Sequence, residues 1–357
     1  MLERMNQPAP LAHARREKPT FDPAIPISIL DLASVGEGET IADSFAGSVK
    51  LAQLAEQTGY KRVWYAEHHS INSIASSATS VLIAHVGAQT TTIRLGAGGI
   101  MLPNHSPMLI AEQFGTLETL YPGRIDLGLG RAPGSDQLTA RALRRDPISS
   151  ERFPQDVLEL QAFLSDESPI EGVRAIPGEG TNVPLYILGS STFGAQLAAQ
   201  LGLPYAFASH FAPRLLHSAI DIYRRTFQPS AQLEQPYVIA GVGVLAAETN
   251  EIAMEEYAQV RRNWAREILS RGGGPKLSLE EVDMLLGTPR AAMVDEMLHF
   301  TAAGNPQEAV AYLEEFQRIT GADELITAHR ALSVDARLRS VRLLAEALEL
   351  APITPAF

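Results

Sequence analysis

The sequence contains no cysteine among its 357 residues. This absence excludes disulfide bonds, thiolate metal ligands and a cysteine nucleophile, and it fits the reducing cytoplasm as the place of action. No apolar run is long enough to cross a bilayer. Basic residues are outnumbered by acidic ones, with a formal net charge of -12. We therefore expect no binding to nucleic acids or to membrane surfaces.

Residues 1–24 contain a charged stretch and several prolines but no apolar segment of the kind that a secretory signal requires. They are predicted to form a flexible N-terminal arm outside the fold, and wrapping around a neighbouring subunit is an alternative for them. The basic cluster at 141–145 is interpreted as a solvated helix face.

From residue 25 onward, short apolar runs alternate with longer helical patterns. The runs predict strands at 27–31, 62–66, 93–97, 125–130, 185–188, 205–209, 237–245 and 324–328. Helices are predicted at 40–58, 75–90, 107–120, 151–164, 193–201, 213–226, 250–270, 306–319 and 333–349. Strands that are apolar on both faces and separated by amphipathic helices indicate a parallel sheet covered on both sides. Eight such units predict a single (β/α)8 TIM-type barrel over residues 25–357.

Two stretches interrupt the alternation. Residues 165–184 are rich in proline, glycine and acids, which predicts a loop insertion. Residues 264–300 contain three consecutive glycines, a proline and then an acidic patch, which predicts a helix-rich excursion from the barrel. In such barrels the active site lies on the loops that follow the strands, so the catalytic and binding residues are expected there.

The second predicted strand ends in Glu67-His68-His69. Neighbouring residues of a strand point to opposite faces, so His68 and His69 are poorly placed to bind one metal ion together. Histidine-based metal barrels use His-x-His at this place, and no metal site is predicted. One histidine buried against a loop and one in solvent is the alternative to a catalytic role.

Three glycines lie close together at the end of the third strand: Gly96, then Gly98 and Gly99 after Ala97. Residues without a Cβ allow a planar ligand to approach the backbone closely, and they equally allow a bulge or a tight turn. Asn104 and His105 then supply polar groups before the next helix.

Arg131 directly follows the fourth strand. The planar fork of an arginine on this face suits a phosphate group. A structural ion pair with Asp126 or Asp136 is the competing interpretation. The glycine spacing around Arg131 does not match a dinucleotide-binding motif.

After the fifth strand, Ser190, Ser191 and Thr192 lie between Gly189 and Gly194, where a helix begins. Hydroxyl groups and free backbone N–H groups at a helix N-terminus attract anions. Ordinary N-capping is the alternative, although three hydroxyls exceed what capping requires. Together with Arg131, this pattern predicts a phosphorylated ligand.

These motifs resemble the luciferase-like flavin-dependent monooxygenases, and in particular the alkanal-monooxygenase-like subgroup. The resemblance covers about residues 25–350 and rests on Glu67-His68-His69, residues 95–103, Pro122-Gly123-Arg124 and residues 198–204. Where luciferase has a reactive cysteine beside the flavin, this chain has Gly130, and Ser190 replaces the family's acid of the phosphate loop. Light emission and an aldehyde substrate are therefore not expected.

The resemblance implies a site for FMN. It implies a cis peptide between Gly98 and Gly99 under the flavin ring, and it implies that His68 is the catalytic histidine, serving either the reaction of the flavin with O2 or substrate deprotonation. It also implies a homodimer built on the helices at 75–90 and 107–120, and a mobile loop at 270–289, for which an inert surface excursion is the alternative. The predicted cofactor-binding residues are Ala97, Gly98, Gly99, Asn104, Arg131, Gly189, Ser190, Ser191 and Thr192.

The predicted function is a two-component monooxygenase. In this prediction, O2 and reduced FMN are used to oxygenate a small organic substrate. The reduced FMN is expected to come from a separate flavin reductase, because no segment of the chain resembles a nicotinamide site. The alternatives are an F420-dependent oxidoreductase on the same barrel and a flavin-binding protein without turnover. A metal-dependent barrel hydrolase is disfavoured because the histidines are adjacent rather than alternating.

Overall fold

The computed structural model describes residues 25–132, 137–146, 148–269 and 277–352, so the predicted N-terminal arm at 1–24 lies outside the described residues. The strands are β1 (Ile27–Asp31), β2 (Arg62–Tyr65), β3 (Arg94–Met101), β4 (Ile125–Gly130), β5 (Leu185–Gly189), β6 (Tyr205–Phe207), β7 (Val238–Ala246), β8 (Thr301–Gly304) and β9 (Glu324–His329). The helices are α1 (Ile41–Thr58), α2 (Thr79–Gly87), the 3-10 helix η1 (Leu102–Asn104), α3 (Pro107–Leu120), α4 (Gln137–Ala142), α5 (Phe153–Leu164), α6 (Thr192–Leu201), α7 (Leu216–Thr226), α8 (Asn250–Leu269), α9 (Leu279–Leu286), α10 (Ala291–Met297), α11 (Pro306–Thr320) and α12 (Val334–Ala347).

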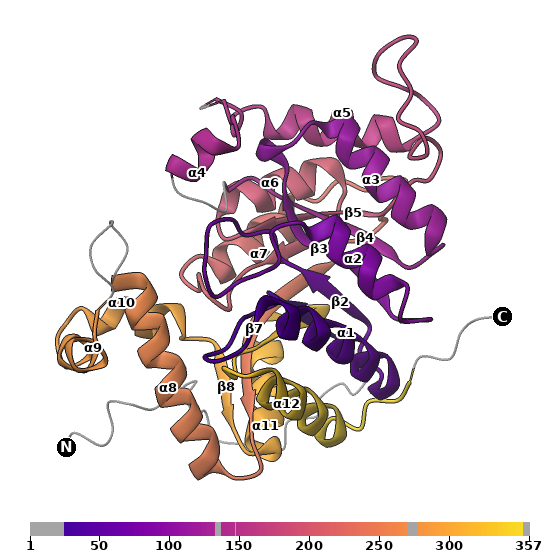
Figure 1. The fold of residues 1–357 in the computed structure, drawn as a ribbon. Helices are drawn as coiled ribbons and strands as arrows, with labels where there is room; N and C mark the ends of the chain where they lie inside the picture. The colour runs from indigo at the N-terminus through magenta and orange to yellow at the C-terminus, as the bar shows by residue number, and fades with distance from the viewer. Residues whose placement is uncertain (1–24, 133–136, 147, 270–276, 353–357) are drawn as a thin grey trace.

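Eight parallel strands close into a barrel in the order β1, β2, β3, β4, β5, β6, β7 and β9, and β9 pairs back with β1. Helices surround the strands, as Figure 1 shows. The (β/α)8 barrel predicted from the sequence is confirmed. In this closed order β4 stands opposite β9, and β2 stands opposite β6.

The strand β8 was not predicted. It pairs with β7 at Gly243 to Ala246, beyond the three residues at which β6 pairs with β7. Because β9 occupies the other edge of β7, β8 extends the wall where β6 has already ended. Its sequence, Thr-Ala-Ala-Gly, has little β-propensity of its own. Pairing with β7, rather than local preference, makes it a strand.

The helix ends follow the residues that were expected to cause them. Gly59, Gly202 and Gly321 are the C-caps of α1, α6 and α11, and each lies in the left-handed region. Thr40 caps α1 in a reciprocal pair with Asp43. These ends fix where each following strand enters the barrel wall.

Buried charged and aromatic side chains fill the amino-terminal end of the barrel interior. Arg62 donates to Asp126 over 2.7 Å and forms an ion pair with Glu324 at 3.0 Å. Trp64 and Tyr186 pack edge to face at a centroid distance of 5.0 Å. Burial alone would raise the pKa of Asp126, but the charges of Arg62 and Arg94 lower it. This layer is the closed floor beneath the mouth of the barrel.

The excursion predicted at 264–300 contains the end of α8, which corresponds to the helix predicted at 250–270, and the whole of α9 and α10. These three helices lie together to one side of the barrel (Figure 1). Within the loop predicted at 270–289, residues 270–276 lie outside the described residues. The remainder contains α9, which Ser278 and Glu281 cap reciprocally and which buries Val282 completely. The described half is thus a folded helix, and the mobility of the loop stays a prediction.

Candidate active site

The carboxyl ends of the barrel strands carry most of the residues that the sequence singled out. His68 follows β2, the glycines end β3, Arg131 follows β4 and the hydroxyl residues follow β5. Parallel strands that close into a ring bring these loops to one mouth. The predicted site residues are therefore gathered on one face of the molecule.

Glu67 is the centre of a hydrogen-bonded cluster that joins the ends of β2 and β3. Its carboxylate is 1% exposed and lies 2.8 Å from Nε2 of His69 and 2.9 Å from Nε2 of His105. It also accepts the backbone N–H of Met101 at 2.9 Å and Nδ2 of Asn104 at 3.2 Å. Asn104, predicted to bind the cofactor, thus contacts this carboxylate.

The environment keeps Glu67 ionised. Burial alone would raise the pKa of this carboxyl group, but the hydrogen bonds from His105 and His69 and the nearby charge of His105 outweigh it. The pKa of Glu67 is lowered to about 2. The sequence motif showed Glu67 without indicating this role, because the partners on β3 and η1 are more than thirty residues away.

His68 is partly exposed and does not share the partner of His69. It lies close enough to His210, on the loop after β6, to affect that residue electrostatically. Burial above all, with the charges of Arg330 and His68, lowers the pKa of His210 to about 3. The low pKa of His210 makes it a neutral imidazole at neutral pH.

The glycine-rich end of β3 contains a cis peptide between Gly98 and Gly99, as predicted. At the same place the register between β3 and β4 shifts between Ala97 and Ile100. Gly98 is partly exposed, and a Cβ there would lie 2.8 Å from Leu30 and 2.9 Å from Trp64. The bulge, one of the two alternatives, is therefore present, and the ligand surface at Gly98 stays a prediction.

Two other residues of this strand face away from the mouth. The side chain of Ala97 is fully buried in the core that contains Ile100 and Leu127, so only its backbone could meet a ligand. Gly99 lies against β4, where a Cβ would be 2.6 Å from the carbonyl oxygen of Gly128.

Arg131 extends from the end of β4 over the ring of Phe193, with 4.0 Å between its guanidinium carbon and the ring centroid. It is exposed. The predicted alternative of an ion pair with Asp126 is wrong, because that carboxylate is held by Arg62 and Arg94. Asp136, the other alternative partner, lies outside the described residues.

The contact with Phe193 brings Arg131 to the N-terminus of α6. Ser191 is the N-cap residue, yet its side chain makes no capping hydrogen bond. Its carbonyl oxygen instead accepts the hydroxyl of Tyr205 at 3.0 Å. Ser190 is exposed, and Gly189 and Thr192 are partly exposed. The alternative of N-capping by Ser191 is therefore not seen, and the three hydroxyl residues lie at the same helix end as Phe193, which Arg131 contacts.

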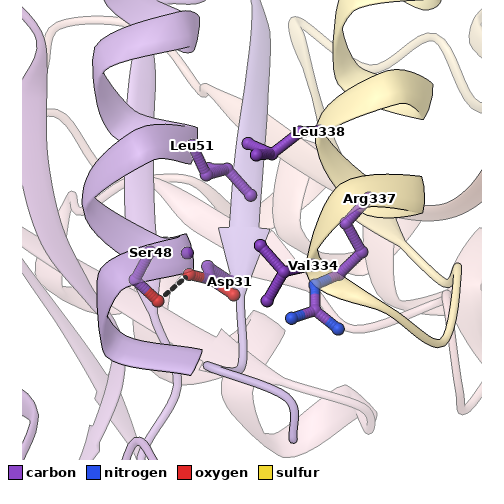
Figure 2. A pocket seen from close by; sticks show the side chains of 7 residues that line it. Asp31, Ser48, Leu51, Val334, Arg337 and Leu338 are labelled. Atoms are coloured by element: carbon purple, nitrogen blue, oxygen red, sulfur yellow. Dashed lines mark hydrogen bonds between the residues drawn. The ribbon is translucent and has the colours of Figure 1, made fainter. Parts of the chain in front are cut away.

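A small crevice lies elsewhere, outside the barrel wall between α1 and α12 (Figure 2). Asp31 accepts the hydroxyl of Ser48 at 2.6 Å and the backbone N–H of Ala33 at 2.9 Å. Arg337 donates to the carbonyl oxygen of Ser34 at 2.8 Å. These bonds hold the loop after β1 against both helices, which is a structural task.

In the part of the chain that the structure describes, no group of three or more His, Cys, Asp or Glu side chains is arranged to hold a metal ion. None of the helices in the described ranges combines the length and the apolar character that a bilayer crossing requires.

The arrangement of these loops agrees with a known family. The model of the luciferase-like monooxygenases matches residues 25–323. The chain belongs to this family. As a luciferase-like monooxygenase it is an oxidoreductase enzyme, and the family resemblance inferred from its motifs is confirmed.

Relatives of this luciferase-like monooxygenase align over most of its length. It is 46% identical to a luciferase-like monooxygenase of Escherichia coli over 325 residues, which cover 90% of this chain and 96% of the relative. An N-acetyl-S-alkylcysteine monooxygenase of Bacillus subtilis is 44% identical over 189 residues, or 52% of this chain and 57% of the relative. The crystal structure of apo-MsnO8 superposes with a TM-score of 0.82 and 36% identity, covering 92% of this chain and 99% of that one.

More distant structures share the fold. An oxygenating constituent of 3,6-diketocamphane monooxygenase from Pseudomonas putida, in complex with FMN, has a TM-score of 0.66 at 16% identity and covers 92% of this chain and 98% of its own. An F420-dependent secondary alcohol dehydrogenase has a TM-score of 0.67 at 15% identity, with coverage of 91% and 99%. At these identities the likeness concerns the barrel alone.

Proposed function

We propose that this luciferase-like monooxygenase binds reduced FMN from a separate flavin reductase in the cytoplasm and uses O2 to oxygenate a small organic substrate. The observation that carries the proposal is the position of Arg131. Its exposed guanidinium lies over Phe193 at the N-terminus of α6 and, among the residues that the structure describes, forms no ion pair. A cation beside free helical N–H groups favours a phosphate.

The geometry of β3 fits the remainder of FMN. Gly98 offers backbone without a side chain at a partly exposed position of the mouth. The strand β3 pairs with β4, the strand that ends before Arg131. Arg131, Ser190, Ser191 and Thr192 would thus hold the phosphate of the cofactor, and Gly98 would support its ring. Gly189 would line the path between them.

FMN is favoured over F420 by the charge of the chain. F420 carries a polyacidic tail, which requires a basic channel, whereas this chain has a formal net charge of -12. The phosphate of FMN requires only the single arginine and the helix N-terminus described above. F420-dependent oxidoreduction is the second candidate.

Reduced FMN, when bound, supplies the electrons that activate O2. The residues of the chain would orient the ring, exclude water and move protons. His68 is the residue proposed for proton transfer, because it is partly exposed on the loop after β2 and lies within electrostatic range of His210, which is neutral. Glu67 would position the loop that carries His68 by holding His69 and His105.

The name of the Bacillus subtilis relative suggests a substrate class to test. That protein acts on N-acetyl-S-alkylcysteine, as its name states. Because the alignment covers only about half of each chain, we propose thioethers as the first substrates to examine here.

Titration of the flavin-free protein with FMN, reduced FMN and F420, read by absorbance and fluorescence, tests the cofactor. Tight binding of FMN in either redox state with weak binding of F420 is the expected result. Tighter binding of F420 than of both forms of FMN would favour the second candidate.

Turnover is tested separately, because a protein can bind flavin without catalysis. Substrate-dependent consumption of O2 is expected with a flavin reductase, FMN and a thioether panel. If O2 consumption never depends on any added substrate, the flavin-binding protein without turnover becomes the better description.

A further inference from the structure

Arg330 directly follows β9, the strand opposite β4 in the barrel ring. Its backbone N–H donates to the carbonyl oxygen of Val244 on β7 at 2.8 Å. Arg330 and Arg131 therefore stand on opposite sides of the same mouth. The cofactor site described above uses the Arg131 side only, and the Arg330 side has no role in it.

The strand β7 leaves room for this arginine. A Cβ at Gly243 would lie 2.3 Å from Nε of Arg330 and 2.8 Å from Oγ1 of Thr301. A Cβ at Gly241 would lie 2.4 Å from Nδ1 of His210. Ile239, two residues before Gly241, packs with Trp64 and Tyr186 inside the barrel. By the alternation of strand residues, both glycines therefore face the interior, where Arg330 and His210 fill the space.

Arg330 is held in place without an anionic partner. Nη2 donates to the carbonyl oxygen of His210, and the guanidinium carbon lies 5.0 Å from the ring centroid of Trp264 on α8. Among the described residues no aspartate or glutamate forms an ion pair with it. Arginines on α8 and α12 do have carboxylate partners, since Arg261 pairs with Asp295 and Arg339 pairs with Glu256.

Other polar atoms around Arg330 also lack partners. Nε of Arg330, Nδ1 of His210 and Oγ1 of Thr301 are buried and form no hydrogen bond with any described residue. Thr301 is 0% exposed and His210 is 8% exposed. Buried polar groups are normally satisfied, so a cluster of unsatisfied ones calls for a missing partner. The charge of Arg330 indicates that this partner is an anion.

We propose that Arg330, supported by Trp264 and Thr301, binds the carboxylate group of the organic substrate. The inference rests on the proposed function, because it concerns the substrate of the same mouth. Arg330 donates to the carbonyl oxygen of His210, and His210 is close enough to His68 to be affected by its charge, so a carboxylate at Arg330 would leave the rest of the substrate on the side of the mouth that His68 can reach.

The charge of the site limits the class of ligand. Burial lowers the pKa of Arg330 to about 10, so the guanidinium stays charged at neutral pH. His210 is neutral there, because burial lowers its pKa to about 3. One positive charge suits a singly charged carboxylate better than a phosphate dianion, which the Arg131 side would take instead.

Binding to the flavin-free protein tests the proposal independently of flavin chemistry. Calorimetric titrations would use butanoate, hexanoate, octanoate and N-acetyl-S-methylcysteine, each beside its own primary amide, so that only the charge differs within a pair. The wild-type protein is expected to bind at least one acid about 10- to 100-fold more tightly than its amide, the range for a charge-assisted hydrogen bond.

Four variants assign the preference to this cluster. Arg330→Met is expected to bind acid and amide equally, and Arg330→Lys to keep part of the preference. Gly243→Ala keeps the charge but forces the guanidinium to move, so it is expected to reduce the preference. Arg261→Met removes one positive charge from α8 at a residue paired with Asp295 and is expected to change nothing.

Two outcomes would overturn the proposal: a wild-type protein that binds no acid of the panel more tightly than its amide, or an Arg330→Met variant that keeps the preference. If Arg330→Met does not fold, Gly243→Ala takes its place: an unchanged preference for acid over amide in that variant would also overturn the proposal. Failure to bind FMN would instead count against the proposed function, and it is measured in a different titration.

Discussion

At the scale of single residues, the proposed binding of FMN depends most on Arg131. Replacement by alanine is expected to weaken FMN binding by about 1.5–3 kcal/mol, because a charge-assisted hydrogen bond to the phosphate is lost. Riboflavin has no phosphate and should bind both proteins equally. Fluorescence titration with the two flavins measures the difference. Equal losses for FMN and riboflavin would remove Arg131 from the phosphate site.

His68 and His69 are adjacent in sequence but differ in surroundings. His68→Ala is expected to leave flavin affinity within a few-fold while lowering substrate-dependent O2 consumption by about 100-fold, as for a positioned acid–base group. His69 contacts Glu67, so His69→Ala should lower stability more than His68→Ala does. If only His69→Ala abolishes turnover, in a protein of unchanged stability, the catalytic assignment belongs to the other histidine.

At the scale of elements, Glu67 links the end of β2 to the end of β3. Glu67→Gln is expected to destabilise the protein by about 1–3 kcal/mol at pH 7, because buried donors lose an ionised acceptor. The pKa of about 2 in the folded protein lies below 4.5, the ordinary value for a glutamate side chain. The carboxylate therefore stabilises the fold fully above pH 4.5, and this stabilisation is lost as the pH falls toward 2.

Urea unfolding at pH 7 and at pH 3.5 measures this dependence. The difference in free energy of unfolding between wild type and Glu67→Gln should be smaller at the lower pH. Glu255→Gln, at an exposed position of α8, serves as the control and should stay within about 0.5 kcal/mol. A difference that is the same at both pH values would contradict the assigned pKa.

The floor of the barrel depends on Arg62, which joins β2 to β4 and β9 through Asp126 and Glu324. Arg62→Met is expected to cost about 3–5 kcal/mol of unfolding free energy, because it leaves buried carboxylates without a full set of partners. The exposed pair of Arg225 and Asp221 is the comparison, and Arg225→Met should cost less than about 1 kcal/mol. Similar urea midpoints for both variants would show that the floor tolerates the loss.

The sequence predicted most elements because their local signals agree with their tertiary roles. The runs at 27–31 and 125–130 became β1 and β4 with the same bounds, since both are apolar and end at polar or glycine residues. The strand β8 has four small or neutral residues and becomes a strand only through β7. No local pattern could have shown it.

The candidate site was predictable where chemistry follows a strand directly. Arg131 and the hydroxyl residues could be found in this way, whereas the cis peptide between Gly98 and Gly99, which the structure contains, was implied only by the family resemblance. The partners of Glu67 and the surroundings of Arg330 depend on which loops meet across the mouth. Two signals for Arg330 were nevertheless available: an arginine two residues after the last predicted strand, at 324–328, and Gly241 and Gly243 alternating in the strand predicted at 237–245.

At the scale of the whole molecule, the homodimer stays a prediction. The two helices expected at its interface carry exposed apolar side chains: Val81 on α2 is 68% exposed, and Leu109 and Leu120 on α3 are 55% and 58% exposed. Burying them against a second copy would remove apolar surface from water. We expect sedimentation at twice the chain mass of 38.6 kDa.

Substitution of Val81 and Leu109 by aspartate should shift that species to the monomer, because charges would then be buried in the interface. Leu158→Asp changes an apolar side chain of α5 that is 51% exposed and should leave the dimer intact. A wild-type protein that sediments as a monomer at micromolar concentration would count against the prediction.

The segment between β7 and β8 leaves the barrel and returns to it at neighbouring points, since the N–H of Ala247 donates to the carbonyl oxygen of Gly304 at 3.1 Å. Evolution could therefore lengthen, shorten or replace everything between these residues while the path of the barrel strands stays the same. Trp264 belongs to this exchangeable segment, whereas Arg131 and α6 do not. Proteins that descend from one ancestor could in this way keep the Arg131 side of the mouth, where we propose that the cofactor binds. They could differ in the substrates that bind on the opposite side, beside Trp264.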